Sequence, residues 1–272
     1  MENDLHQRSK IIRKNILEIL SRSKSSHIGS CFSIVDLLVV LYSRILNIKA
    51  TAPQDPNRDI FMLSKGHAAV ALYAVLAEFG FVSSKILDTF GKDGTVLANH
   101  VTINCLSGVE NTAGSLGHVL SMAAGMAWAA KAGDNNNRRF YCLMGDGECN
   151  EGSVWEAAMF AKHHQLNNLV AIVDYNKQQG MGFSGTIMNF ENMAERWQAF
   201  GWEVVEVSGH NFEEIERSFA ILNSSKNKNP KLLLANTIKG KGVSFMENKV
   251  EWHYKSPNQL ELDMAIRELD SI

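Results

Sequence analysis

The chain has 272 residues, of which 45% are hydrophobic and 21% charged, the composition of a globular protein large enough to bury a sizeable core. Its 27 Lys and Arg residues nearly balance its 29 Asp and Glu residues, for a formal net charge of −2, and no run of basic residues supplies the field that duplex nucleic acid requires. Composition and charge therefore exclude a disordered or collagen-like chain and argue against nucleic acid as a partner.

Other features predict a cytoplasmic protein that does not cross a membrane. No apolar run approaches the roughly 20 residues of a membrane span. The start, MENDLHQRSK, lacks the apolar core of a signal peptide. The four cysteines form no Cys-x-x-Cys pair and are too few for a disulfide framework, so we expect them to be reduced: Cys31, Cys105, Cys142 and Cys149.

The first half of the chain is predicted to be mostly helical. Apolar residues at helical spacing predict a helix over residues 5–21. Ser33-x-x-Asp36 resembles a capping box ahead of a second apolar helix, LLVVLYSRIL. A strand and two further helices are predicted over residues 60–63, 68–78 and 116–130.

The second half alternates short apolar runs with helical stretches. The apolar runs predict strands over residues 140–144, 169–174, 203–207 and 232–236. Strands separated by helices form βαβ units, so the predicted fold class is α/β, a doubly wound parallel sheet with helices on both faces. Because no linker, repeat or low-complexity tract divides the chain, residues 1–272 are expected to form one domain.

Two of the predicted strands end in residues suited to a metal diphosphate. The first runs into Gly145-Asp146-Gly147. A helix begins near Glu151, and this strand, turn and helix geometry lets backbone amides approach a phosphate. The next strand ends at Asn176, which should lie beside Asp146 because neighbouring parallel strands end at the same edge. A carboxylate and an amide oxygen suit Mg²⁺ or Ca²⁺ better than zinc, although Gly-Asp-Gly by itself is more often a plain turn.

A longer stretch that includes these residues resembles the thiamine diphosphate motif of the transketolase family: GDGECNEGSVWEAAMFAKHHQLNNLVAIVDYNKQQ. The family motif also begins with Gly-Asp-Gly and closes with Asn. Four other stretches are similar to transketolase N-terminal regions and follow in family order: SSHIGSCFSIVDLL (25–38), DIFMLSKGHAAVALYAVLAEFGF (59–81), GVENTAGSLGHVLSMAAGMA (108–127) and KGKGVSFMENKVEWHYKSP (239–257). Together they span nearly the entire chain.

The resemblance implies how the cofactor is held. Asp146, the side-chain oxygen of Asn176 and the backbone carbonyl of Gln178 match the family's ligands to the divalent metal. The positions that match its other thiamine diphosphate contacts are His67, Gly114, Leu116, Gly145, Gly147 and His253. The chain offers few local cations, so a metal is expected to neutralise the diphosphate.

Four histidines stand in transketolase-like contexts, although a lone histidine is more often a plain core or surface residue. They are His27 in SSHIGS, His67 in SKGHA, His100 in ANHVT and His253 in EWHYK. The matching family positions surround the reactive carbon and the substrate hydroxyls, where an imidazole can donate, accept or shuttle protons. His27 and His100 are expected to touch the transferred two-carbon unit, and His253 the diphosphate and the reacting centre. Val101 stands where the family usually has proline, which could alter the substrate pocket.

Two glutamates match acidic residues that the family places at its dimer interface, near the carboxylate that activates the cofactor. They are Glu151 and Glu156. The plainer interpretation is favourable charge at the start of a helix. We expect Glu151 to belong to the catalytic apparatus, and both interpretations stay open for Glu156. Four other histidines are expected to be plain core or surface residues: His6, His163, His164 and His210.

The resemblance also implies a partner chain. In transketolases, the glutamate that protonates the cofactor's aminopyrimidine belongs to a domain that follows this region, and the present sequence ends at Ile272 without it. We therefore expect the N-terminal subunit of a split transketolase, completed by a separate C-terminal chain in an α2β2 heterotetramer. The complete enzyme would use the C2 carbanion of thiamine diphosphate to transfer a two-carbon ketol unit (glycolaldehyde) from a ketose phosphate to an aldose phosphate.

Three alternatives are also compatible with the sequence. The chain could be the α subunit of a 2-oxo acid dehydrogenase, but the stretches EGSVWEAA and KGKGVSFMEN favour transketolase. It could belong to a split enzyme of specialised metabolism that uses the same cofactor on a different acceptor. It could also be a binding protein that kept the fold without the chemistry, which the intact Asp146, Asn176 and motif histidines argue against.

Overall fold

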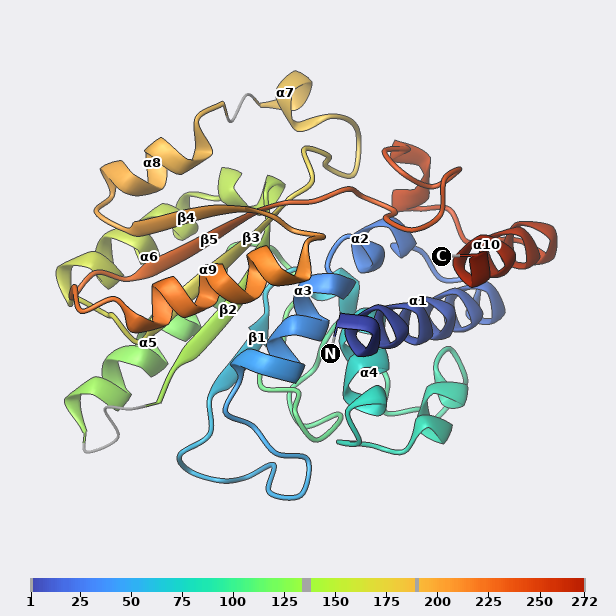
Figure 1. Ribbon diagram of the computed structural model, residues 1–272, viewed down its shortest axis with the longest axis horizontal. Coiled ribbons are helices and arrows are strands. Elements are labelled where there is room, and N and C mark those ends of the chain that lie inside the picture. Colours follow the sequence, from blue (N-terminus) through green and yellow to red (C-terminus); the bar gives the residue numbers. More distant parts are fainter. Residues whose placement is uncertain (1, 134–137, 189–190, 272) are drawn as a thin grey trace.

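The computed structural model describes residues 2–133, 138–188 and 191–271, which surround a central five-stranded sheet (Figure 1). The strands are β1 (Ile60–Leu63), β2 (Phe140–Gly145), β3 (Leu169–Tyr175), β4 (Glu203–Ser208) and β5 (Lys231–Asn236). All neighbours pair in parallel, in the order β1-β2-β3-β5-β4. The predicted α/β fold is therefore confirmed, and every predicted strand is present with small shifts at its ends.

Helices cover both faces of this sheet. The α-helices of the described residues are α1 (Glu2–Ser23), α2 (Ile28–Phe32), α3 (Val35–Val40), α4 (Ala69–Glu78), α5 (Val119–Ala132), α6 (Gly152–His163), α7 (Ser184–Ile187), α8 (Met193–Ala199), α9 (Phe212–Ser224) and α10 (Gln259–Ser271). The chain crosses the sheet in one direction from β1 to β3 and returns from β4 to β5. Right-handed connections then place α5 and α6 on one face and α9 on the other, which is a doubly wound sheet (Figure 1).

The apolar runs that predicted the strands are buried on both faces of the sheet. Every residue of β1 is buried, and so are all residues of β2, β3 and β5 except the last of each. The edge strand β4 is mostly half-exposed or exposed, and it carries the charged residues Glu203 and Glu206. A strand covered by helices on both sides has no solvent-facing positions, so its sequence reads as a continuous hydrophobic run.

The sequence was expected to hold no apolar run that approaches the length of a membrane span, but the segment Ile28–Ile45 is such a run. It comprises α2, α3 and a π-helical turn over Leu41–Ile45, and it is long and apolar enough by composition to cross a membrane. However, 83% of the segment is buried inside the fold. Core helices of globular proteins pass the same test of length and hydropathy, and the packing of these helices identifies them as such.

The predicted capping box over Ser33 and Asp36 is wrong. Ile34 precedes α3, and no side chain caps that helix. Ser33 Oγ instead donates a hydrogen bond to Asp174 at 2.7 Å, and both residues are buried. Asp36 accepts two hydrogen bonds from Arg13, each at 2.8 Å. The polar groups of Ser33 and Asp36 thus bind residues far away in the sequence and do not cap the helix.

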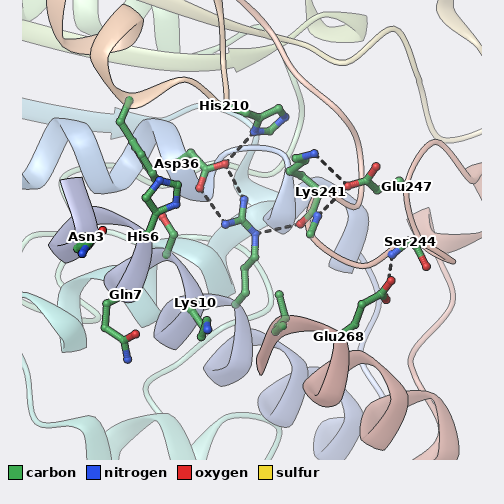
Figure 2. A pocket seen from close by; sticks show the side chains of 15 residues that line it. Asn3, His6, Gln7, Lys10, Asp36, His210, Lys241, Ser244, Glu247 and Glu268 are labelled. Atoms are coloured by element: carbon green, nitrogen blue, oxygen red, sulfur yellow. Dashed lines mark hydrogen bonds and ion pairs between the residues drawn. The ribbon is translucent and has the colours of Figure 1, made fainter. Parts of the chain in front are cut away.

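Asp36 is the centre of a buried network that fastens α1 and α3 to the loop before α9. Its carboxylate accepts from His210 Nδ1 at 2.8 Å (Figure 2). His210 Nε2 in turn accepts from the Ile238 amide at 2.8 Å. Burial alone would raise the pKa of Asp36, but Arg13 and His210 outweigh it and hold that pKa below its usual value. Since the pKa is lowered on folding, the carboxylate stabilises the fold above about pH 4 and loses this contribution as the pH falls further.

Replacing His210 with Ala should lower the free energy of unfolding by about 1–3 kcal/mol, because Asp36 loses a hydrogen bond and the Ile238 amide loses its acceptor. Urea unfolding at pH 7 measures the difference. The exposed His163, replaced in the same way, should change the stability by less than about 0.5 kcal/mol. Equal losses in the two variants would show that His210 has no special structural role.

Candidate active site

A cavity of about 440 Å³ opens at the carboxyl ends of β2 and β3, where the sequence predicted a ligand. Eleven of the twelve predicted site residues line it: His27, His67, His100, Leu116, Gly145, Asp146, Gly147, Glu151, Asn176, Gln178 and His253. Gly114 is exposed and does not line this cavity, so its contact with a cofactor stays a prediction. Segments as distant in sequence as α2 and the turn before α10 therefore meet at one place.

The acidic end of the cavity is built around Asp146. This residue follows β2 directly and is only 3% exposed. Its carboxylate accepts hydrogen bonds from the Gly147 amide at 2.8 Å and from Ser184 Oγ at 3.1 Å. Burial, and next the negative charge of Asp174, raise the pKa of Asp146 to about 6. A buried carboxylate of this kind is best stabilised by a cation.

Asn176 lies at the end of the neighbouring strand and is held by two hydrogen bonds. Its Nδ2 donates to Asp174 Oδ2 at 3.0 Å, and its Oδ1 accepts from the Gln178 amide at 3.0 Å. These two partners fix the orientation of the side-chain amide, with its nitrogen toward Asp174 and its oxygen toward the Gln178 amide. Since Gly145 pairs with Asp174 across the two strands, the predicted convergence of Asp146 and Asn176 on one cavity is confirmed.

Two buried lysines line the same cavity, and the sequence motifs predicted neither. Lys65 Nζ forms an ion pair with Asp174 at 2.5 Å and also donates to the Ser30 carbonyl at 2.9 Å. Lys239 is 1% exposed, and burial, with the charge of Lys65, lowers its pKa to about 8. The expectation of few nearby cations was wrong, because both lysines reach the cavity from segments distant in the sequence from Asp146.

Glu148 is a second buried carboxylate that the motifs did not single out. It is 1% exposed and accepts hydrogen bonds from the Gly117 amide at 2.8 Å, the Gly145 amide at 3.2 Å and the Ser64 hydroxyl. Burial raises its pKa. One side chain thus joins the loop after β1, the loop before α5 and the end of β2, and so fixes the shape of this part of the cavity. With φ at +87°, Gly117 also explains why α5 begins at Val119 instead of residue 116.

The four motif histidines form a cluster in the same cavity. The ring centroid of His27 lies 5.1 Å from those of His67 and His253 and 6.2 Å from that of His100. Burial, and then neighbouring basic groups, lower the pKa of His27 to about 4 and that of His253 to about 3, and the pKa of His67 is also well below its usual value. At neutral pH these three side chains are therefore uncharged and can donate or accept hydrogen bonds.

Two further contacts orient this cluster. His27 adopts the left-handed conformation, with φ at +77°, which is rare for a residue with a side chain. Its amide donates to the His253 carbonyl at 2.9 Å, which ties the two segments together. Lys239 Nζ lies 2.9 Å from His253 Nδ1, and since an ammonium only donates, the proton of this imidazole sits on Nε2. The left-handed backbone of His27 is a strained conformation, and strain of this kind often marks a functional position.

Of the two glutamates that match interface positions, only Glu151 lines the cavity. Glu151 precedes α6 without making a side-chain cap and lines the cavity, whereas Glu156 is exposed one turn further along the helix. Their expected places at an interface therefore stay predictions. Both carboxylates are nevertheless accessible to another chain.

A larger cavity, of about 770 Å³, lies between α1, α10 and the loop that contains Lys241 (Figure 2). Its charged groups largely neutralise one another, with Arg13 paired to Asp36 and Lys241 paired to Glu247. None of the predicted catalytic or cofactor residues lines it. His6 and His210, which were expected to be plain residues, lie here, outside the candidate active site.

Comparisons with known proteins agree with the geometry. The family model described as "Transketolase, thiamine diphosphate binding domain" matches residues 6–267. The chain is 43% identical over 257 residues to a protein of Phocaeicola vulgatus that is named as one subunit of an apulose-4-phosphate transketolase, covering 94% of this chain and 90% of that protein. It is 40% identical over 267 residues to "6-deoxy-6-sulfo-D-fructose transketolase subunit SqwG" of a Clostridium species, covering 98% and 96%.

A solved structure gives the same result. The transketolase of Campylobacter jejuni superposes with a TM-score of 0.91 at 30% identity, over 98% of this chain and 42% of the larger one. The chain thus spans about two fifths of the solved transketolases that it matches. It belongs to the family of transketolase thiamine diphosphate-binding domains, as its sequence motifs predicted.

Proposed function

We propose that this chain, a single domain over residues 1–272, is the cofactor-holding subunit of a two-chain transketolase in the cytoplasm. The observation that carries the proposal is the meeting of Asp146, Asn176 and four histidines in one cavity. Relatives that are named as transketolase subunits, and that this chain covers almost completely, support a two-chain enzyme. The complete enzyme would transfer a two-carbon ketol unit from a ketose phosphate to an aldose phosphate.

The acidic end of the cavity fits a metal diphosphate. Asp146 offers a carboxylate, Asn176 an amide oxygen and Gln178 a backbone carbonyl, all of which are hard oxygen ligands. The side-chain amide of Gln178 and the Nε2 atom of Gln179 are buried without a hydrogen-bond partner among the described residues. No three His, Cys, Asp or Glu side chains of the described chain form a complete metal site, so we infer Mg²⁺ or Ca²⁺ that takes further oxygens from the diphosphate.

The chain's own residues prepare the site for this reaction. Thiamine diphosphate, when bound, supplies the nucleophilic carbon and the electron sink for C–C bond cleavage. Lys65 and Lys239 add positive charge to the cavity that receives the diphosphate. His27 and His253 are both uncharged at neutral pH, so they can form hydrogen bonds with a carbonyl or hydroxyl of the substrate. As neutral rings, they also add no positive charge that would repel the metal. His100 lies beside His27 and lines the same cavity.

A partner chain would supply what these residues do not. In the proposed enzyme, a C-terminal subunit would supply the glutamate that faces the cofactor's aminopyrimidine, and two chains of each kind would form the heterotetramer. The exposed face of α5 and α6 supports such an assembly. The two helices pack together and expose large apolar side chains: Met122, Met126, Trp128, Met159 and Phe160. Contiguous apolar patches of this kind mark protein interfaces.

A charge placed on this face should disrupt the assembly. Met159 is 55% exposed on α6, and Met159→Lys would bury an unpaired ammonium in a covered apolar interface. We expect association with the partner chain to weaken at least about tenfold, measured by light scattering and co-purification. Leu260→Lys on α10, where Leu260 is 69% exposed, is the control and should assemble normally. Normal assembly of Met159→Lys would remove this face from the interface.

The function is tested by purifying the chain alone and together with a transketolase C-terminal chain from the same organism. Ketol transfer from a ketose phosphate to an aldose phosphate is followed in both samples, with thiamine diphosphate and Mg²⁺ present. We expect transfer only when both chains are present. Activity of the isolated chain would overturn the two-chain proposal, and an inactive complex that still binds the cofactor would overturn the ketol transfer.

The acceptor and donor can differ from those of ordinary sugar phosphate metabolism. The two relatives described above carry names for different sugars, apulose 4-phosphate and 6-deoxy-6-sulfo-D-fructose, although both resemble this chain at about the same level. This observation favours, as a second candidate, a split enzyme of specialised sugar metabolism. A substrate panel that includes both sugars separates the candidates. Release of CO₂ from a 2-oxo acid with acyl transfer to a lipoyl group would instead indicate the dehydrogenase.

A further inference from the structure

A large aromatic side chain stands at the mouth of the active-site cavity. Tyr254 is 64% exposed, although tyrosine is usually at least half-buried in a fold of this size. It also lines the cavity, and its ring centroid lies 4.6 Å from that of His253 and 6.0 Å from that of His27. The ring therefore extends the histidine cluster outward to the solvent.

The loop after β3 leaves room for the polar end of this side chain. A Cβ atom on Gly180 would stand 2.9 Å from Tyr254 Oη and 3.2 Å from His253 Nε2. Any larger residue at position 180 would displace one of these atoms. Tyr254 thus reaches from the cluster to the loop that follows Asn176 and Gln178, across part of the cavity mouth.

Two hydrogen-bonding atoms converge at this point. His253 Nε2 carries a proton, because Lys239 occupies Nδ1. Tyr254 Oη belongs to a side chain that is 64% exposed, and a phenol hydroxyl can donate or accept. Adjacent hydroxyls of a sugar need such a pair of polar partners, and the aromatic ring beside them suits the C–H groups of the same carbon chain.

We propose that Tyr254 determines substrate specificity by contacting the sugar chain beyond the transferred two-carbon unit. The inference rests on the proposed function. His27 and His67 lie further inside the cavity, where the reacting carbons belong, whereas Tyr254 faces the solvent side, where the rest of a ketose phosphate would extend. A substrate reaches the histidines past this ring.

The experiment uses the complex with the C-terminal chain and compares long donors with a short one. Five-, six- and seven-carbon ketose phosphates carry the extended chain, while 3-hydroxypyruvate delivers the same two-carbon unit with loss of CO₂ and lacks that chain. Tyr254→Ala should lower kcat/KM for the ketose phosphates about tenfold or more and leave 3-hydroxypyruvate within about twofold. Tyr254→Phe should lose about 3- to 10-fold, if the hydroxyl makes one hydrogen bond. Leu260→Ala is the surface control.

Direct binding separates the possible failures. Calorimetry should show weaker binding of the ketose phosphate to the Tyr254→Ala complex, with unchanged affinity for thiamine diphosphate and Mg²⁺. An equal loss with the short and long donors, an unchanged specificity or a failure to assemble would each overturn the proposed contact, since they indicate a structural or interface role. If the wild-type complex neither binds nor converts any ketose phosphate, the proposed function itself fails.

Discussion

Asp146→Asn should lower the affinity of the assembled enzyme for thiamine diphosphate and Mg²⁺ more than about 100-fold, with a matching loss of ketol transfer. The new amide keeps the size of the side chain and an oxygen for the Gly147 amide. It removes the negative charge that the metal requires at the end of β2. Calorimetric titration of the complex with the cofactor, at fixed Mg²⁺ concentration, measures the change.

The stability of the same variant distinguishes a lost ligand from a damaged fold. Burial and Asp174 raise the pKa of Asp146, so its charge opposes folding at pH 7. Without cofactor, Asp146→Asn should therefore unfold at the same urea concentration as the wild type, or at a higher one. Asp88→Asn, at a surface position that is 72% exposed, should change neither property. Cofactor affinity within about threefold of the wild type would show that Asp146 is not a metal ligand.

The fold was predictable because its signals are local and strong. Strands covered on both faces, such as β2 and β3, are unbroken apolar runs, and the helices between them dictate parallel pairing. The site followed from the same logic. Once β2 and β3 are neighbours, their ends meet, and Asp146 and Asn176 line one cavity. The histidines could be found only through the family resemblance, since nothing in the spacing of His27, His100 and His253 predicts that they meet.

The wrong predictions share a physical cause: buried polar groups form hydrogen bonds and ion pairs with residues that are far away in the sequence. Ser33 and Asp36 have the spacing of a helix cap, but one binds Asp174 and the other binds Arg13 and His210. A local motif cannot reveal such partners.

The buried lysines and Glu148 escaped prediction for the same reason. The ion pair of Lys65 and Asp174 joins residues 109 positions apart, and Glu148 binds groups up to 84 positions away. In sequence they are charged residues within the motif stretches, and nothing about their spacing marks them as buried. Only the fold shows that Lys65 supports the residue that in turn positions Asn176.

Lys65→Met should lower the free energy of unfolding by about 3–5 kcal/mol, because it leaves the fully buried Asp174 carboxylate without its cation. Asp174 also accepts hydrogen bonds from Ser33, Thr237 and Asn176, so the loss should extend to the metal site. Without a fixed Asp174, the amide of Asn176 is no longer held with its oxygen toward Gln178. We therefore expect about 10–100-fold weaker cofactor binding in addition to the lower stability. Urea unfolding and calorimetric titration measure the two effects.

Two further variants identify the ion pair as the cause. Lys14→Met removes a lysine whose partner, Asp270, is 56% exposed, and it should cost less than about 1 kcal/mol. Adding Asp174→Asn to Lys65→Met removes the stranded charge while keeping a hydrogen-bonding oxygen, so the double variant should be more stable than Lys65→Met alone. Such a recovery is expected only if the cost of Lys65→Met comes from an unpaired buried carboxylate. If the double variant is less stable than Lys65→Met, the lysine acts mainly through packing and its bond to the Ser30 carbonyl, and Asp174 is held by its other partners.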